Sequence, residues 1–257
     1  ITELSLEIDK LKIPNHVAVI MDGNGRWGVK KGLSRSHGHN KGVSVLKDII
    51  KFSKQLGVKV LTVYAFSTEN WSRPAGEVDF LLDLFGKVLE NEIDNLHREL
   101  IRIKFIGDLS PFSEKLRNKF IEAENITKNN NKFTLNVCTN YGGRQEMIKV
   151  AKELANKSLS GEINPEQINE ELFESLLLTS EFKEPDLLIR TSGEKRVSNF
   201  LLWQLAYSEI YFTDVLWPDF DETEFLKAII DYQSRNRRFG GIESISKQSL
   251  KSALYYG

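Results

Sequence analysis

The sequence predicts an α/β fold: a single domain with a mainly parallel, about six-stranded central sheet flanked by helices. Short β-branched apolar runs alternate with longer stretches that repeat apolar residues at helical spacing, which is typical of this fold class. Polar clusters rich in glycine and arginine follow most of these runs, and open α/β sheets bind ligands at the carboxyl ends of their strands. The 257 residues are enough to bury the core of one such domain.

Six segments are expected to form the strands. The run Val17-Ala18-Val19-Ile20 is short and continuously apolar, which suits a strand buried on both faces. The expected strands cover residues 17–20, 58–66, 103–106, 133–137, 187–189 and 209–212. Residues 14–242 would form the folded domain, with residues 1–13 as a peripheral N-terminal arm and residues 243–257 as a peripheral tail.

Helical spacing of apolar residues predicts the connecting helices. One helix should end at Gly57, and others should cover about residues 76–101, 111–128, 144–157 and 165–178. A short helical segment is expected at residues 200–207, and a last helix should begin near residue 222. Residues 30–39 are polar and interrupted by glycine, so we expect a loop there around one short helix.

The helix expected at residues 76–101 has two apolar stripes. The first consists of Leu82, Phe85, Leu89, Ile93, Leu96 and Leu100. The second lies about 100° around the helix axis at about 100° per residue, and it consists of Phe80, Leu81, Leu84 and Val88. One stripe would cover the sheet. The other is typical of packing against another helix, or of a pocket wall for an apolar ligand.

Composition excludes several classes of protein. The net charge of −1 provides no general basic field for nucleic acid. The single cysteine, Cys138, excludes an internal disulfide, argues against a cysteine zinc site and makes the reducing cytoplasm the expected compartment. No apolar run reaches the ~20 residues of a membrane span, and no signal peptide is expected.

The stretch MDGNGRW at residues 21–27 follows the first predicted strand and indicates a phosphate site. Glycines and an amide let backbone N–H groups approach a phosphate closely. Asp22 would repel a bare phosphate, so the pattern favours Mg²⁺ between the acid and a diphosphate. The stretch also fits the dinucleotide fingerprint G-x-G-x-x-G of a Rossmann dehydrogenase, with Asp48 as the ribose acid. That alternative is opposed by Asp22 itself and by the bulk of Arg26 and Trp27.

Five arginines lie in the loops after the predicted strands or beside glycines: Arg26, Arg35, Arg73, Arg190 and Arg196. Arginine forks pair with phosphate oxygens at two points, so five forks at one sheet edge indicate two polyphosphate groups. His39 lies near Arg35 and suits a phosphate donor or proton carrier. Glu209 interrupts an apolar run, where a carboxylate needs either a salt bridge or a metal, and both readings stay open.

Together these motifs resemble the cis-prenyltransferases, of the bacterial undecaprenyl diphosphate synthase type. The resemblance spans residues 14–242 and rests on the following motifs: MDGNGRW at 21–27, Gly38-His39, YAFSTENWSRP at 64–74, Ile106-Gly107-Asp108, NYGGR at 140–144, DLLIRTSGEKRVSNFLLWQLAYSE at 186–209, WPDF at 217–220 and RRFGG at 237–241. The departures are small: Ser192 and His37 stand where relatives often have other residues.

The resemblance implies a reaction, a cofactor and partners. Family members condense isopentenyl diphosphate onto an allylic diphosphate, usually farnesyl diphosphate, and each new double bond is cis. The products are long polyprenyl diphosphates such as undecaprenyl diphosphate, a cell-wall lipid carrier. The resemblance further implies Mg²⁺, a cytoplasmic homodimer, an apolar tunnel, and peripheral membrane contact for product release. The small Ala65 beside the site hints at a long product.

The resemblance also assigns roles by position. Asp22 would bind Mg²⁺ and help to ionise the allylic diphosphate, and Asn70 would lie where the proton is removed. Glu209 would complete the Mg²⁺ site from the partner subunit or from the same one. The allylic diphosphate would be held by Gly23, Asn24, Gly25, Arg26, Arg35 and His39. The residues bordering the substrates would be Trp27, Ser67, Thr68, Glu69, Trp71 and Arg73. Isopentenyl diphosphate would be bound by Arg190, Arg196, Val197 and Ser198. The RRFGG stretch would reach across the dimer.

A non-catalytic partner subunit of a heteromeric prenyltransferase is the rival reading within the same fold. Such subunits lose the acid of the first motif. Asp22, Asn70 and the RRFGG stretch are all intact here, which favours an active enzyme.

Overall fold

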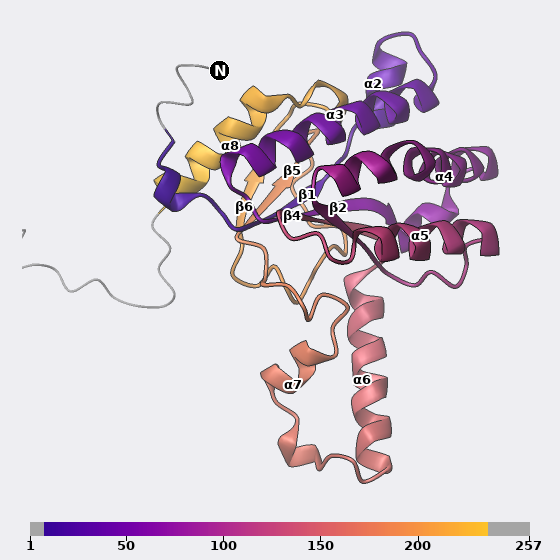
Figure 1. Ribbon diagram of the computed structural model, residues 1–257, viewed down its shortest axis with the longest axis vertical. Coiled ribbons are helices and arrows are strands. Elements are labelled where there is room, and N and C mark those ends of the chain that lie inside the picture. Colours follow the sequence, from indigo (N-terminus) through magenta and orange to yellow (C-terminus); the bar gives the residue numbers. More distant parts are fainter. Residues whose placement is uncertain (1–7, 236–257) are drawn as a thin grey trace, which may run out of the picture.

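One six-stranded sheet, parallel throughout, forms the centre of the molecule (Figure 1). A computed structural model describes residues 8–235. The strands are β1 (His16–Ile20), β2 (Val60–Ser67), β3 (Ile101–Ile106), β4 (Phe133–Tyr141), β5 (Leu187–Arg190) and β6 (Glu209–Phe212). The predicted fold class is thereby confirmed. The RRFGG stretch, the predicted tail and the first seven residues of the predicted arm lie outside the described residues.

The strand order β3-β4-β2-β1-β5-β6 determines where a ligand can bind. The chain leaves β1 towards β2 on one side and later returns to place β5 on the other side of β1. The carboxyl ends of β1, β2 and β5 therefore surround the point where the direction of winding reverses. Such switch points form the ligand crevices of open α/β sheets.

Four long helices cover one face of the sheet. They are α3 (Arg35–Leu56), α4 (Ala75–Arg98), α5 (Glu114–Thr127) and α8 (Glu222–Ser234). Alternation along β1 explains the layering, because Val17 and Val19 pack with these helices in the main core. Within residues 8–235, no helix combines the length and apolar character needed to cross a membrane.

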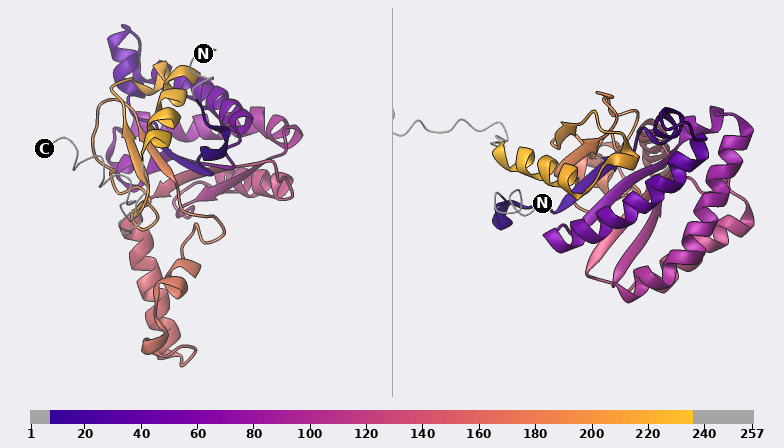
Figure 2. Two further views of the ribbon diagram at one scale, coloured as in Figure 1. Left: turned by 90° about the vertical axis from the view of Figure 1, so that its left-hand side faces the viewer. Right: turned by 90° about the horizontal axis from the view of Figure 1, so that it is seen from above.

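The other face of the sheet is covered differently. Ala18 of β1 packs with Phe200, Leu201 and Leu205, which lie in turns and not in the predicted helical segment. Leu201 has a φ of 43°, a left-handed value that a helix cannot contain. The helices α6 (Gly143–Leu159) and α7 (Glu170–Ser175) project from the body as an arm (Figures 1 and 2).

Helix α3 begins earlier than the sequence suggested. Ser34 accepts a hydrogen bond from the backbone N–H of His37, and this N-cap starts the helix at Arg35. Residues 35–39 are therefore helical and do not form a loop, and they bring Arg35 and His39 to one end of α3. A Cβ at Gly38 would lie 1.8 Å from the backbone oxygen of Asn24, so this glycine lets α2 (Asn24–Lys30) pack against α3.

Smaller boundary corrections have local causes. Ser113 caps α5, so that helix begins at Glu114 and not at Pro111. The stretch predicted as a helix at 165–178 splits into a 3-10 turn, Pro165–Gln167, and the short α7, which Asn169 caps. Helix α4 ends at Arg98, and Leu100, with a φ of 55°, leads directly into β3.

Candidate functional site

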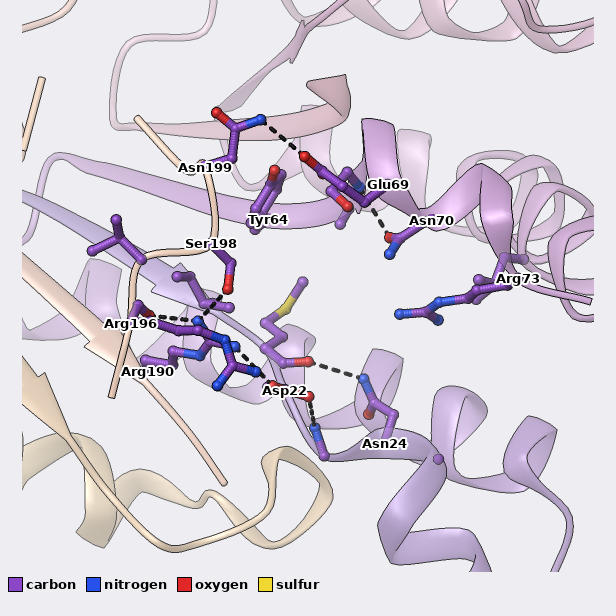
Figure 3. Close-up of a pocket in the computed structure, with 18 of the residues that line it drawn as sticks. Asp22, Asn24, Tyr64, Glu69, Asn70, Arg73, Arg190, Arg196, Ser198 and Asn199 are labelled. Carbon is purple, nitrogen blue, oxygen red and sulfur yellow. Dashed lines mark hydrogen bonds and ion pairs between the residues drawn. The ribbon is translucent and has the colours of Figure 1, made fainter. Parts of the chain in front are cut away.

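A pocket of about 950 Å³ opens at the carboxyl ends of β1, β2 and β5 (Figure 3). It brings together residues predicted from widely separated parts of the chain. The predicted residues that line it are Asp22, Gly23, Asn24, Gly25, Arg26, Arg35, His39, Ser67, Glu69, Asn70, Arg73, Arg190, Arg196, Val197 and Ser198. The strand ends at Asp22, Ser67 and Arg190 therefore converge on one pocket.

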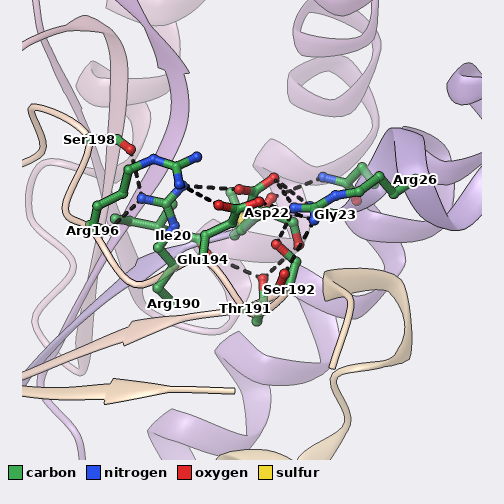
Figure 4. A network of polar contacts seen from close by, with 12 residues as sticks. Ile20, Asp22, Gly23, Arg26, Arg190, Thr191, Ser192, Glu194, Arg196 and Ser198 are labelled. Atoms are coloured by element: carbon green, nitrogen blue, oxygen red, sulfur yellow. Dashed lines mark hydrogen bonds and ion pairs between the residues drawn. The ribbon is translucent and has the colours of Figure 1, made fainter. Parts of the chain in front are cut away.

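Asp22 lies between two arginines at the end of β1 (Figure 4). Its Oδ2 accepts a hydrogen bond from Nη2 of Arg190 at 3.1 Å, and its Oδ1 lies 3.4 Å from Nη2 of Arg26. Partial burial alone would raise the pKa of Asp22, but the hydrogen bond from Arg190 and the charge of Arg26 hold it below its usual value. Asp22 is therefore an anion at neutral pH.

Backbone geometry presents this carboxylate to the pocket. The N–H of Gly23 donates to Oδ1 of Asp22 at 2.8 Å. Gly23 has a φ of 107°, and a Cβ there would lie 2.9 Å from the side chain of Leu216. Only glycine fits this turn between strand and helix without strain. The sequence pattern Asp-Gly thus has a direct structural cause.

Arg190 is the buried cation of the pocket, with a side chain 4% exposed. Its Nη1 donates to the backbone oxygen of Arg196 at 2.5 Å and to Oγ of Ser198 at 2.7 Å. Because Nη2 bonds Asp22, one guanidinium joins the end of β1 to the loop after β5. In that loop, Glu194 pairs with both Arg26 and Arg196.

Glu77 of α4 gathers a second cationic group. Its carboxylate pairs with Nε of Arg35 and Nη1 of Arg73, each at 3.0 Å, and lies 3.5 Å from Nε2 of His39. The hydrogen bond from Arg35 lowers the pKa of Glu77, so the carboxylate is charged. A Cβ at Gly25 would lie 2.5 Å from the Arg35 guanidinium, so glycine leaves the room that this side chain occupies.

His39 is a neutral member of this second group at neutral pH. Burial lowers the pKa of its imidazole, and the charge of nearby Arg73 lowers it further. A neutral ring offers one donor nitrogen and one acceptor nitrogen. His39 therefore suits hydrogen bonding to a phosphate better than charge neutralisation.

The turn after β2 is fixed by a capping box. Ser67 and Asn70 begin η2 (Thr68–Ser72), and Oδ1 of Asn70 accepts a hydrogen bond from the Ser67 N–H at 3.0 Å. The carbonyl oxygen of the Asn70 side chain is therefore engaged by the backbone. What Asn70 offers the pocket is its NH₂ group, which is a donor and not a base.

Three predicted bordering residues do not line the pocket. Trp71 donates from Nε1 to Oδ1 of Asn140 at 2.9 Å and packs edge-on against Phe66. Trp27 donates to Oδ1 of Asp219 at 2.7 Å. The Oγ1 of Thr68 is buried, with no hydrogen-bond partner among the described residues. Trp71 supports the turn after β2 and Trp27 anchors α2.

Glu209 corrects another expectation. It is the first residue of β6 and pairs with Leu187, the first residue of β5, whereas Arg190 beside Asp22 is the last residue of β5. In parallel strands this separates Glu209 from the pocket edge by about 10 Å, at ~3.3 Å per residue. Its Oε2 accepts a hydrogen bond from Nη1 of Arg235 at 2.7 Å. Asp22 and Glu209 of one chain therefore lie too far apart to share a metal, and the same-chain version of that prediction is wrong.

Several lining residues were missed by the sequence analysis. These residues carried no assigned role: Tyr64 in β2, Arg144 and Gln145 at the start of α6, and Asn199 and Leu202 in the loop after β5. Glu77 and Glu194, which pair with the pocket arginines, were missed too. The four-residue spacing of Arg73 and Glu77 across the start of α4 was a usable signal for the first of these acids.

The second apolar stripe of α4 was expected either to pack against another helix or to form a pocket wall, and the position of each residue now decides between the two. Leu81 is buried and lines the pocket, together with Ala65. Leu84 and Val88 are half-buried and do not line the pocket. Among the four residues of this stripe, the wall function therefore applies to Leu81.

No cluster of three or more histidine, cysteine or acidic side chains suitable for a metal occurs among residues 8–235. Asp22 remains the pocket acid that pairs with Arg190 and Arg26. Mg²⁺ commonly uses one or two carboxylates and completes its shell with water and substrate phosphate oxygens. The donor set therefore fits a metal that arrives with a diphosphate, and it does not fit an all-protein metal site.

Comparison with known proteins agrees with this pocket. A model of the family described as putative undecaprenyl diphosphate synthase matches residues 20–240. An isoprenyl transferase of Prochlorococcus marinus subsp. pastoris is 68% identical over 252 residues, covering 98% of this chain and 93% of the relative. The farnesyl-diphosphate-specific ditrans,polycis-undecaprenyl-diphosphate synthase of Haemophilus influenzae is 51% identical over 238 residues, covering 93% and 100%.

Solved structures extend the comparison. A lavandulyl diphosphate synthase from Lavandula x intermedia, crystallised with dimethylallyl diphosphate, superposes with a TM-score of 0.87 at 39% identity, covering 91% of this chain and all of that one. A probable undecaprenyl diphosphate synthase from Campylobacter jejuni gives 0.74 at 33%, covering 89% and 99%. Neither the dehydrogenase alternative nor the non-catalytic subunit finds support in these comparisons. The chain belongs to the undecaprenyl diphosphate synthase family of prenyltransferases.

Proposed function

We propose that this enzyme elongates an allylic diphosphate, farnesyl diphosphate, by repeated cis condensation with isopentenyl diphosphate. The product is a long polyprenyl diphosphate such as undecaprenyl diphosphate, and each step releases diphosphate. One observation carries the proposal: a single pocket holds two arginine groups, one joined by Glu77 and the other by Asp22 and Glu194, next to an apolar wall. Relatives named as farnesyl-diphosphate-specific synthases support it.

The two arginine groups divide the substrates between them. Arg35, Arg73 and His39, with the backbone of residues 23–26 at the start of α2, bind the allylic diphosphate. Arg190, Arg196 and Ser198 bind isopentenyl diphosphate. The geometry supports this division, because Glu77 holds the first group together while Arg190 and Glu194 hold the second. Arginine forks match phosphate oxygens at two points each.

Asp22 is the residue that would hold Mg²⁺. It is ionised, partly exposed and positioned between the two diphosphate sites. When bound, the metal would neutralise charge on the departing diphosphate. Arg190 and Arg26 would keep the carboxylate oriented until substrate arrives.

The chemistry then needs orientation more than covalent participation by the protein. The carbon–oxygen bond of the allylic diphosphate breaks, and its electron pair leaves with the diphosphate. The double bond of isopentenyl diphosphate attacks the allylic carbon, and a proton is lost from the adjacent carbon of the former isopentenyl unit. Arginines that already surround the leaving oxygen lower the barrier without reorganisation.

Asn70 orients the acceptor of that proton. Since its own carbonyl oxygen accepts a backbone hydrogen bond, its NH₂ group can hold a diphosphate oxygen or water that takes the proton. We expect Asn70→Ala to slow a single turnover by about 100-fold, in the range for general acid–base positioning. A near-normal single-turnover rate would contradict this role.

A second copy of the chain completes the enzyme as a homodimer. Helix α6 carries an exposed apolar stripe of Ile148, Ala151, Ala155 and Leu159, with Ile148 57% and Leu159 87% exposed. A stripe of this kind on a projecting helix suits a partner helix. Glu209 can contribute to a metal site only from that second copy. Light scattering at several concentrations tests the dimer, and Leu159→Lys should weaken it.

The apolar product has to reach a membrane. We expect the enzyme in the cytoplasm, where the buried free thiol of Cys138 stays reduced. Peripheral contact with the bilayer would then let the product leave the pocket.

The decisive assay combines farnesyl diphosphate, labelled isopentenyl diphosphate and Mg²⁺, and reads product length by chromatography. Wild type should make a long-chain product, and Asp22→Ala should lose at least about 1,000-fold in rate. A chelator should abolish the wild-type reaction, and Mg²⁺ should restore it. No long-chain product from wild type would overturn the proposal.

A further inference from the structure

We propose that Asn199 is a positioning residue that locks the isopentenyl diphosphate side of the pocket to the turn that carries Asn70. The inference rests on the proposed function. It deepens that function by naming the residue that fixes the distance between the isopentenyl diphosphate side and the turn that carries Asn70. Asn199 belongs to the loop after β5 and lies at the pocket wall, where it contacts the start of α6 and the turn η2 (Figure 3). No catalytic role for Asn199 itself is required.

Asn199 caps helix α6 from outside that helix. The N-cap residue of α6 is Gly142, which has no side chain to satisfy the first N–H groups. Asn199 supplies acceptors for the first two of these groups, because its backbone oxygen accepts from the Gly143 N–H at 2.7 Å and its Oδ1 accepts from the Arg144 N–H at 2.8 Å. The position of Asn199 is therefore fixed by a 17-residue helix.

The side-chain amide of Asn199 makes the link to η2. Its Nδ2 donates to Oε1 of Glu69 and to Oε1 of Gln145, each at 3.0 Å. Glu69 immediately precedes Asn70, and Ser198, which accepts from Arg190, immediately precedes Asn199. One side chain thus joins the two segments that must hold isopentenyl diphosphate and its proton acceptor in register.

Asparagine suits this position for two physical reasons. Its short side chain ends in an amide that offers one acceptor oxygen and two donor hydrogens. Aspartate lacks the donors, and alanine lacks the donors and the acceptor. The φ of 63° at Asn199 is left-handed, as is the 46° of Ser198 beside it. Asparagine tolerates this region better than most residues, and such strain at a site indicates a functional constraint.

Loss of the link should affect the two substrates unequally. The isopentenyl group depends on the loop that Asn199 holds, whereas the allylic group is held independently by Glu77. For Asn199→Gly we expect kcat to fall about 30-fold and KM for isopentenyl diphosphate to rise about 10-fold, because displacements near 1 Å can cost 100-fold in rate. KM for farnesyl diphosphate should change less than twofold.

Glycine is the informative replacement because it accepts a left-handed φ without strain. The matched control is Leu100→Gly, which replaces a left-handed residue with a φ of 55° at the end of α4, away from the pocket. We expect both variants to fold, and Leu100→Gly to keep wild-type kcat and KM. Wild-type kcat and KM in Asn199→Gly would overturn the proposal.

A swap of donor and acceptor tests the bond to Glu69 directly. Asn199→Asp keeps an acceptor for the Arg144 N–H but places its carboxylate against that of Glu69. In the double variant, Glu69→Gln provides an amide donor to the new carboxylate, so the hydrogen bond is restored with donor and acceptor exchanged. The double variant should be at least 10-fold more active than the product of the two single effects predicts. Effects that simply multiply would overturn the link. Asn199→Asp alone should regain activity relative to wild type as pH falls towards 5, because protonation removes the repulsion.

A binding measurement separates failure of this inference from failure of the proposed function. Titration calorimetry with inorganic pyrophosphate should show weaker binding in Asn199→Gly by about fivefold and unchanged binding in Leu100→Gly. If wild type makes no polyprenyl product but the pyrophosphate affinities follow this pattern, the proposed function fails and the positioning role holds. If wild type makes the product and neither the kinetics nor the affinity responds to Asn199→Gly, the positioning role fails.

Discussion

The two ends of the sheet use polar side chains in opposite ways. Near the amino ends, His16, Thr62 and Asn136 lie on three neighbouring strands and bond one another. Nε2 of His16 lies 2.6 Å from Oγ1 of Thr62, and Nδ2 of Asn136 donates to the same oxygen at 3.1 Å. Burial lowers the pKa of His16 to about 4, so this row is neutral at physiological pH. Neutral groups that bond each other inside a sheet fix strand register and need no ligand.

The carboxyl ends hold charges that share partners. Asp22, Glu77 and Glu194 each pair with two of the arginines that line the pocket. An incoming diphosphate must compete with these acids or join them. One end of the sheet thus uses buried polar groups for stability, and the other uses partly exposed charges for exchangeable binding. Changes at the carboxyl end should therefore alter turnover, and changes at the amino end should alter unfolding.

The largest effect is expected at Arg190. Arg190→Met removes the link from Asp22 to Ser198 and should lower kcat/KM about 1,000-fold, equivalent to ~4 kcal/mol. The acid limb of the pH–rate profile should also move to higher pH, because the pKa of Asp22 rises without Arg190. Steady-state assays across pH measure both effects.

Arg102→Met is the matched control, because Arg102 is also a strand arginine in an ion pair, with Glu181, but outside the pocket. We expect it to keep wild-type turnover. Equal losses in Arg190→Met and Arg102→Met would remove the distinction between pocket and structural arginines.

The next effect concerns stability and His16. The folded pKa of about 4 lies below the ordinary value of 6.5, so the unfolded chain binds a proton that the folded chain does not. Stability must therefore fall as pH drops from 6.5 to 4, by about 3 kcal/mol for this residue. Urea unfolding at each pH measures the slope. His16→Gln should flatten it, and an unchanged slope in that variant would assign the pH dependence to other groups.

A smaller effect is expected at Glu77. Glu77→Gln weakens the ion pairs to Arg35 and Arg73 and should raise KM for farnesyl diphosphate about 10-fold, or ~1.4 kcal/mol, with little change for isopentenyl diphosphate. Glu92→Gln is the matched control: Glu92 also lies on α4, but its ion pair, with Lys47 of α3, is outside the pocket. Equal changes in both KM values would show that the two arginine groups are not independent.

The smallest effect on rate is expected at the apolar pocket wall, where a substitution should change the length of the product. Leu81→Trp introduces bulk into the pocket wall and should shorten the product by one or more isoprene units. Leu84 belongs to the same stripe but does not line the pocket, so Leu84→Trp should shorten the product less. Chromatography of the products decides the point, and equal shortening by both variants would extend the wall along α4.

Much of the fold and of the site was predictable because the signals are local. Short apolar runs predicted the sheet, and glycines with arginines after them predicted its binding edge. The predictions failed where a local pattern had two structural outcomes. Residues 200–207 are apolar enough for a helix, but the left-handed backbone at Ser198, Asn199 and Leu201 turns them into the cover of one sheet face. Gly38 belonged to the loop predicted at residues 30–39, yet it serves close packing between helices α2 and α3.

By itself, the sequence determined the parallel sheet, the acid at the end of its central strand and the arginines around it, because side-chain period and strand-end chemistry are read along the chain. Only the tertiary structure decided which charges meet. Glu77, Glu194 and Asn199 became part of the site through contacts between distant segments. Glu209 left it because a parallel strand carries its first residue to the opposite edge from its last. Contacts between elements depend on strand order and helix docking, which no local pattern encodes.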